Sequence, residues 1–220
     1  MSESLNGACD VIHKALGRTA RTGTARLGSM KVERIAEGLW RWTAVHPEWK
    51  PGEEWDAEVA CVYAEEPGAV VLIDPLVPAD DEAGFWQALD RDVERLALPV
   101  AVLVTSHWHE RSAPQVAARY DATREPPESV ERITVSHEEV VYWLPSHATL
   151  VAGDALLGGS GGLRLQPPDW LDGDYTGFVA AVGRLLDLPV ERVLPSHGPA
   201  VVERGREALA HAHQSAATSA

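Results

Sequence analysis

The chain has 220 residues, of which 45% are hydrophobic, and a formal net charge of -14 at pH 7, which fits one acidic globular domain with a sizeable core. The acidic excess excludes a basic face for nucleic acid or an anionic membrane, and no stretch approaches the roughly 20 apolar residues of a membrane span. Two cysteines, Cys9 and Cys61, are too few for a disulfide framework, and the N-terminus has no apolar signal core, so a cytoplasmic protein is predicted.

The N-terminal segment differs from the rest of the chain in amino-acid composition and hydrophobic periodicity. Residues 1–30 are rich in Ser, Thr, Gly and Ala and show little hydrophobic periodicity, so they are predicted to form a flexible tail. One domain is predicted over residues 31–215. Its first strands are expected on either side of a loop at residues 46–56, whose Trp49 and Trp55 are candidate walls of a pocket.

Strands and helices then alternate. The apolar run 69–73 predicts a buried strand that ends on Asp74. Asp80 and Asp81 can cap a helix over 82–98 with one apolar face. The run 100–104 consists of small or β-branched apolar residues, as in a strand buried on both faces. This alternation predicts an α/β fold.

Two histidines follow that last strand directly. His107 and His109 stand two positions apart, so in extended backbone both imidazoles would point the same way, which is a metal-ligand geometry. The next residues predict a helix start: Ser112 and Gln115 have the spacing of a capping box, and Pro114 would lie in the first turn.

The C-terminal half is expected to contain a hairpin, an irregular glycine-rich segment and a helix–strand–helix unit. The glycine-rich segment lacks the GK[ST] ending of a phosphate loop, so it does not predict nucleotide binding. The expected ranges are 140–144 with 148–152, then 156–171, 176–188, 190–194 and 203–213.

One pattern recurs along the chain: an apolar strand, then a residue of metal-ligand type at its C-terminal end. The endings are Asp74, His107 with His109, Asp154 and His197. In a sheet whose strands share one direction these ends converge on one edge. Imidazoles with a carboxylate suit zinc or iron better than magnesium or calcium. The pattern therefore predicts a metal site at this edge.

At these motifs the sequence resembles the metallo-β-lactamase superfamily. The matching pieces are VVLID at 70–74, TSHWHERS at 105–112, LVAGDAL at 150–156 and LPSHGPAV at 194–201, and the resemblance covers about residues 31–215. It implies an αββα sandwich with a metal site on one edge. It also implies metal-dependent hydrolysis of esters, thioesters, amides or phosphodiesters, or redox chemistry at two irons in some members.

The sequence departs from the family's fuller motif, H-x-H-x-D-H. Arg111 and Ser112 stand where that motif has its Asp and its last His, so two ligands of the second metal are missing, which argues against a di-iron oxidoreductase. The Arg111 guanidinium would instead replace that ion electrostatically or clamp an anionic substrate. The family's third histidine would fall at Val135, and His137 follows two residues later. Asp74 resembles the family's structural aspartate, which is expected to hold the ligand loops by hydrogen bonds.

The leading hypothesis is a hydrolase with one zinc or iron ion, acting on an unidentified small ester, thioester or amide. Its small-molecule substrate would be bound without nucleic acid or membrane. The candidate metal ligands are His107, His109, Asp154, His197 and His137. The candidate catalytic residues are Asp154, Glu110 and Arg111, of which the first two would orient the attacking water.

The alternative hypothesis is a non-catalytic protein of the same fold, in which the metal site has decayed into a polar cluster. Such a protein would bind a ligand or a partner. Loss of two ligands and displacement of a third are the changes expected in that case, and fold-level likeness alone does not choose between the two hypotheses.

Overall fold

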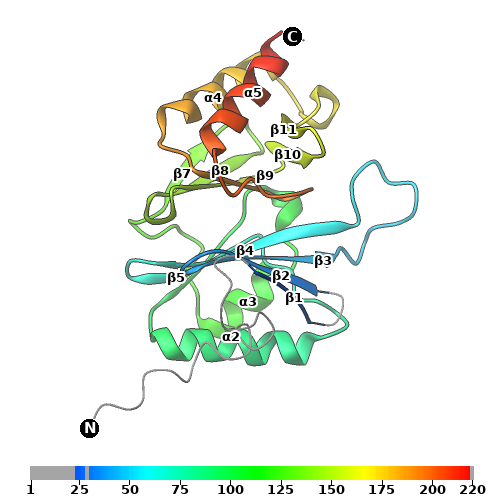
Figure 1. Cartoon of the computed structure of the whole chain (residues 1–220). Coiled ribbons are helices and arrows are strands. Elements are labelled where there is room, and N and C mark those ends of the chain that lie inside the picture. Colours follow the sequence, from blue (N-terminus) through cyan, green and yellow to red (C-terminus); the bar gives the residue numbers. More distant parts are fainter. Residues whose placement is uncertain (1–22, 28–29, 219–220) are drawn as a thin grey trace.

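The structure is a computed structural model that describes residues 23–27 and 30–218. Two sheets lie face to face, with α2 (Glu82–Leu96) and α3 (Ala113–Tyr120) against the outer face of one, and α4 (Tyr175–Arg184) and α5 (Gly205–Ala217) against the outer face of the other (Figure 1). This is the αββα sandwich predicted from the sequence. In the described part of the chain, no helix is both long and apolar enough to cross a bilayer.

The first sheet has six strands in sequence order. They are β1 (Gly23–Leu27), β2 (Met30–Ala36), β3 (Leu39–Val45), β4 (Glu58–Glu66), β5 (Ala69–Ile73) and β6 (Val100–Leu103). Neighbouring strands are antiparallel except β5 and β6, which are parallel.

The strand β1 lies inside the segment predicted as a flexible tail. It pairs with β2 through main-chain hydrogen bonds. An edge strand can form such bonds without alternating polar and apolar residues, so the sequence pattern did not predict this strand. The other residues of the predicted tail, 1–22 and 28–29, lie outside the described residues.

The second sheet has four strands in the order β12-β9-β8-β7. Their bounds are β7 (Glu131–Thr134), β8 (Val140–Leu144), β9 (Thr149–Gly153) and β12 (Arg192–Pro195). The predicted hairpin is confirmed as β8 and β9, and β12 joins β9 in parallel.

A small separate hairpin follows β9, made of β10 (Leu156–Gly159) and β11 (Gly162–Leu165). The sequence predicted an irregular segment here, and that prediction was wrong. All four glycines of this stretch lie at residues 158–162, around the turn, where they hide the alternation of the two short strands.

The unbroken apolar runs of β5 and β6 are explained by burial on both faces. Val70 and Leu72 pack in the cluster that includes residues of α2 and α3, whereas Val71 and Ile73 pack between the two sheets with Leu144 of β8. All five residues are at most 1% exposed. Burying each such side chain contributes about 1.5–3 kcal/mol, so these strands anchor the edge of the sheets from which the site loops emerge.

Helix α2 begins where the sequence predicts, because the Asp81 side chain accepts a hydrogen bond from the Gly84 N–H (3.2 Å). Helix α3 begins at Ala113, but the predicted capping box is wrong. The Ser112 hydroxyl instead accepts from the Val77 N–H (3.0 Å), so this side chain ties the helix start to the loop after β5.

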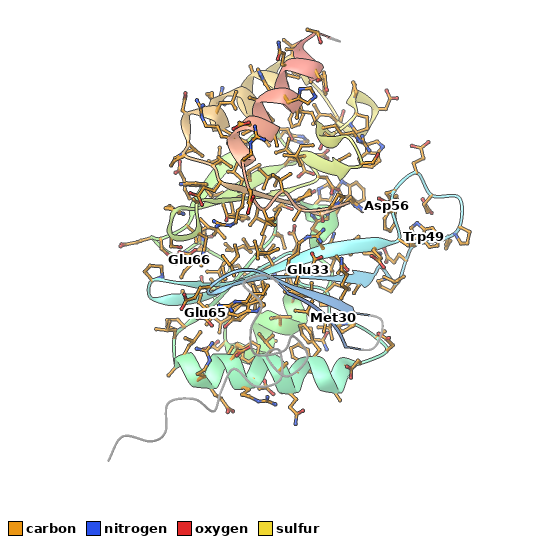
Figure 2. The ribbon with its side chains drawn as sticks, in the orientation of Figure 1. Met30, Glu33, Trp49, Asp56, Glu65 and Glu66 are labelled. Atoms are coloured by element: carbon orange, nitrogen blue, oxygen red, sulfur yellow. The ribbon has the colours of Figure 1, made fainter. Side chains whose placement is uncertain are left out.

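The loop between β3 and β4 projects from one end of the sandwich and carries Trp49 and Asp56 (Figure 2). The indole N–H of Trp49 donates to the Trp55 carbonyl (2.9 Å), which closes the loop on itself. Glu65 and Glu66 lie at the opposite end of β4 (Figure 2).

Glu66 is expected to make the protein less stable as the pH rises. Its side chain is buried, and burial raises its pKa above 4.5, although the Ser146 hydroxyl (2.8 Å) and His147 oppose the shift. When the pKa is higher in the folded protein than in the unfolded chain, the protonated group contributes to the free energy of unfolding below pH 4.5. This contribution is lost as the pH rises through the folded-state pKa, and the free energy of unfolding falls by no more than about 1.4 kcal/mol per pH unit. Glu66→Gln should remove this loss, so the variant should be more stable than the wild type at pH 8 and about equally stable at pH 4.

Urea unfolding of wild type and Glu66→Gln at pH 4 to 8 tests this expectation. Glu53→Gln is the matched control, because Glu53 is an exposed loop carboxylate. An unchanged pH profile in Glu66→Gln would show that this carboxyl group titrates normally in the folded protein.

Candidate metal centre

The four turns that carry the predicted site residues lie at one edge of the sandwich. Asp74 follows β5 and His109 follows β6, in the first sheet, whereas Asp154 follows β9 and His197 follows β12, in the second. Each of these strand pairs is parallel, so its two turns lie on one side of its sheet. The proximity of His109 to Asp154 and His197 shows that both pairs end on the same side of the sandwich. The turns therefore meet across the seam between the sheets.

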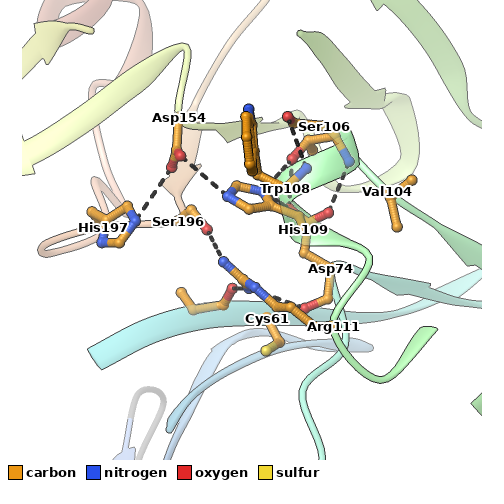
Figure 3. A network of polar contacts seen from close by, with 12 residues as sticks. Cys61, Asp74, Val104, Ser106, Trp108, His109, Arg111, Asp154, Ser196 and His197 are labelled. Carbon is orange, nitrogen blue, oxygen red and sulfur yellow. Dashed lines mark hydrogen bonds and ion pairs between the residues drawn. The ribbon is translucent and has the colours of Figure 1, made fainter. Parts of the chain in front are cut away.

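Three of these side chains form a compact group that fits a metal ion. One ligand atom each from His109, Asp154 and His197 lies within 4.8 Å of the other two. His109 Nε2 is 3.2 Å from Asp154 Oδ2, and His197 Nε2 is 3.6 Å from Asp154 Oδ1 (Figure 3). Two imidazoles and a carboxylate are a donor set for zinc or iron. Asp154 Oδ1 is buried without a hydrogen-bond donor, and a cation would satisfy it.

Asp74 orients His109 from behind. Its Oδ1 accepts from the Thr105 N–H (2.8 Å), and its Oδ2 accepts from the Thr105 hydroxyl (2.6 Å) and lies 3.0 Å from His109 Nδ1. A carboxylate that holds Nδ1–H leaves Nε2 directed at the other two side chains. This is the supporting role predicted for Asp74.

His109 is the most strongly perturbed group of the site. Burial opposes a charge on its imidazole, but Asp74 and Asp154 together outweigh burial and raise the pKa of His109 to about 10. In turn, burial opposes a charge on Asp154, whereas His109 and His197 lower its pKa. A metal ion that binds here must displace a proton from His109, which makes metal binding pH-dependent.

His107 lies outside the group, and the expectation of extended backbone is wrong. Residues His107–His109 form a short 3-10 turn, η1, which Ser106 begins by accepting from the Trp108 N–H (3.4 Å). In a helical turn, side chains two positions apart diverge. His107 is exposed, and its ring lies against Trp108 with the ring centroids 4.2 Å apart.

Two other candidates also lie away from the group. His137 is exposed. Glu110 is exposed as well and forms a two-pronged ion pair with Arg124, whose NH1 and NH2 donate over 3.1 and 2.8 Å. The structure therefore brings together His109, Asp154 and His197, and it does not bring His107, His137 or Glu110 to them.

Arg111 lies beneath the group and joins the two sheets. Its NH1 donates to the carbonyls of Ala60 (3.0 Å) and Asp74 (3.2 Å), and its NH2 donates to the Ser196 hydroxyl (2.9 Å) (Figure 3). The guanidinium contributes to lowering the pKa of Asp154. The predicted permanent cation is thus present beside the site, where it also serves as a cross-link.

Glu139 is a site residue that the sequence analysis missed. It precedes β8, lies in the lining of the cavity beside the group, and is 5% exposed. Its Oε2 has no hydrogen-bond partner, and burial, reinforced by Asp154, raises its pKa to about 8. The sequence carried no signal for Glu139, because an acidic residue before an apolar strand is usually exposed and its burial is visible only in the folded chain.

The cavity itself has a volume of about 370 Å³. The three ligand candidates and Glu139 form part of its wall, together with three tryptophans, Trp55, Trp108 and Trp170. A space of this size suits a small molecule.

The comparisons with known proteins agree with this architecture. No protein-family model and no curated protein sequence matches the chain. Among solved structures, a metallo-β-lactamase from Erythrobacter litoralis is 15% identical with a TM-score of 0.58, covering 89% of this chain and 99% of its own. The structure of VMB-1 is 12% identical with a TM-score of 0.59, covering 88% and 99%. The DIM-1 metallo-β-lactamase is 15% identical with a TM-score of 0.56, covering 89% and 100%.

These values establish a shared fold across most of the chain. The protein has the metallo-β-lactamase fold. The αββα sandwich implied by the sequence resemblance is confirmed.

Proposed function

We propose that this protein is a metal-dependent hydrolase that uses one zinc or iron ion held by His109, Asp154 and His197. The observation that carries the proposal is the convergence of three ligand atoms within 4.8 Å of one another, from the buried His109 and His197 and the half-buried Asp154, in the wall of a small-molecule cavity. The proposed substrate is a small ester, thioester or amide.

Two side chains support a single ion rather than a pair. Arg111 and Ser112 stand where the family motif has two further ligands. The terminal nitrogens of Arg111 donate to protein oxygens and carry no free lone pair, and the Ser112 hydroxyl already accepts from the Val77 N–H. Neither residue is arranged to bind a second ion.

A divalent ion bound here would act as a Lewis acid on the substrate carbonyl and would acidify water. The protein's own residues supply orientation and proton transfer. Asp74 fixes the His109 ring, and Glu139, with a pKa raised to about 8, holds a proton at neutral pH that it can give to a leaving group. Glu139 is accordingly proposed as the general acid. Glu110, the sequence candidate for orienting the attacking water, is exposed and paired with Arg124.

The first test is the metal content of protein purified without chelator or nickel. Elemental analysis should find about one zinc or iron ion per wild-type chain. Asp154→Asn keeps the shape of the side chain but removes its charge, so it should lose the ion on dialysis. Hydrolysis of a panel of esters, thioesters and amides should then follow metal content. An empty wild-type site after incubation with excess zinc would refute the proposal.

A second candidate function has its own supporting observation. The two nitrogens of His109 face carboxylates on both sides, Asp74 at 3.0 Å and Asp154 at 3.2 Å. A protonated His109 satisfies both carboxylates without metal, which is the arrangement expected of a decayed site in a non-catalytic ligand-binding protein. Absence of metal together with ligand binding in the cavity would favour this candidate.

A cytoplasmic location is also proposed. The low cysteine content favours a reducing compartment, and Cys61, the described cysteine, is a free buried thiol.

A further inference from the structure

Aromatic side chains from three separate segments line the cavity beside the metal centre. Trp55 comes from the β3–β4 loop, Trp108 from η1, and Trp170 from the 3-10 turn η3 (Pro168–Trp170). Trp108 is 70% exposed, although a side chain of this size is usually buried. Trp55 and Trp170 are half-buried. Indole rings around a cavity offer π faces, which attract cations.

The charged groups of the same cavity are mostly acidic. Three carboxylates line it, Glu48, Glu138 and Asp154, together with the carboxyl group of Glu139, whose pKa of about 8 leaves it protonated at neutral pH. Glu139 is 5% exposed, and its Oε2 has no hydrogen-bond donor, so a buried acceptor in the wall is left for a ligand or a water.

The cations among the described lining residues are engaged by protein groups: His109 lies between Asp74 and Asp154, and Arg111 donates to protein oxygens. Arg111 is the one arginine among them, and no lysine is present. Both terminal nitrogens of Arg111 already donate to protein oxygens, namely the carbonyls of Ala60 and Asp74 and the Ser196 hydroxyl. Three of its five N–H groups are thus used within the protein, and its buried Nε–H has no partner. A substrate carboxylate or phosphate that needs both terminal nitrogens would compete with the cross-link between the sheets.

We propose that the cavity binds a small molecule that carries an alkylated ammonium group, held between the tryptophans and the carboxylates of Glu48 and Glu138. The proposal rests on the proposed function in so far as this molecule is the substrate, with the ammonium group placed away from the ion and the ester or amide group beside it. Binding of the ammonium group itself needs neither metal nor turnover.

Three probes of nearly the same shape test the proposal on the full chain. Choline carries a trimethylammonium group, 3,3-dimethylbutan-1-ol is its neutral isostere, and 3,3-dimethylbutyrate carries a negative charge. Isothermal titration with zinc-loaded and with chelator-treated protein should show choline binding about 10-fold or more tightly than the neutral alcohol, because a desolvated cation–π contact and a nearby carboxylate each favour the charge. The anionic probe should bind most weakly in chelator-treated protein.

Substitutions in the cavity lining test which side chains bind the ammonium group. Trp108→Ala should weaken choline binding about 3- to 30-fold, and Glu48→Gln with Glu138→Gln should weaken it while leaving the neutral alcohol unchanged. Glu53→Gln is the control, since it removes an exposed carboxylate from the same loop as Glu48 without touching the cavity lining. These side chains are exposed or half-buried, so the variants should fold.

Equal affinity for choline and the neutral alcohol would overturn the proposal, as would tighter binding of the anion to metal-free protein. Unchanged choline binding in the Glu48→Gln, Glu138→Gln variant would overturn it as well. Because binding is measured with and without zinc, failure of the hydrolase proposal would appear as absent turnover with choline binding intact, and the two outcomes are distinguishable.

Discussion

Replacing His109 by alanine should abolish metal binding and destabilise the metal-free protein by about 3 kcal/mol or more. The His109 ring is 3% exposed and lies between two carboxylates, 3.0 Å from Asp74 and 3.2 Å from Asp154. Without it, two buried negative charges face each other with no cation between them, although Asp74 keeps its hydrogen bonds from Thr105. Urea unfolding in the presence of chelator measures the destabilisation, and elemental analysis measures the metal.

His107→Ala is the matched control for this prediction. His107 is the other histidine of the HxH motif, but it is exposed on η1. Its replacement should change stability by no more than about 0.5 kcal/mol and leave the metal content unchanged. If His107→Ala lost the ion while His109→Ala kept it, the ligand set proposed from the structure would be wrong.

Gly198→Ala should be nearly as damaging, although it removes no functional group. Gly198 follows His197 with a φ of +78°, and a Cβ there would lie 2.1 Å from the Gly158 carbonyl oxygen. Left-handed backbone costs a side chain about 1–2 kcal/mol, and the clash is with main chain that cannot rotate away. We expect a loss of about 3 kcal/mol or more and, because the neighbouring His197 must shift, a large loss of metal affinity.

Gly161→Ala provides the comparison. It lies in the β10–β11 turn, where a Cβ would meet no atom within 4 Å. Its unfolding free energy and metal affinity should match the wild type. Equal behaviour of the two alanine variants would show that the loop after β12 can move aside without loss.

The fold was predictable because burial on both faces leaves a strong local signal. The runs ending at Asp74 and Leu103 are apolar without interruption, since each side of those strands is covered, and the polar residue after each run marks the edge of the sheet. Asp154 and His197 follow strands of the second sheet in the same way. Because β5 and β6 are parallel, and β9 and β12 are parallel, the turns that follow the two strands of each pair lie next to each other.

The detail of the site was less predictable because it depends on single hydrogen bonds. The Trp108 N–H donates to the Ser106 hydroxyl, and the backbone here forms a 3-10 turn where an extended strand end was expected. In that turn the side chains of His107 and His109 point in different directions. Glu139 gave no motif at all: only the folded chain shows that its carboxyl group is buried beside Asp154. Periodicity reports which face is covered and says nothing of such local contacts.

The centre draws His109 from one sheet and its two partners from the other, and Arg111 crosses the same seam. Binding of an ion to these ligands would therefore be thermodynamically linked to the assembly of the two layers. Separation of the layers would weaken ion binding, and ion binding would oppose that separation to the same extent. The metal would cross-link the two layers. A chain cut between α3 and β7 would leave His109 on one fragment and Asp154 and His197 on the other, so neither fragment would have all three ligands. The affinity of the two fragments for each other should then increase with zinc concentration.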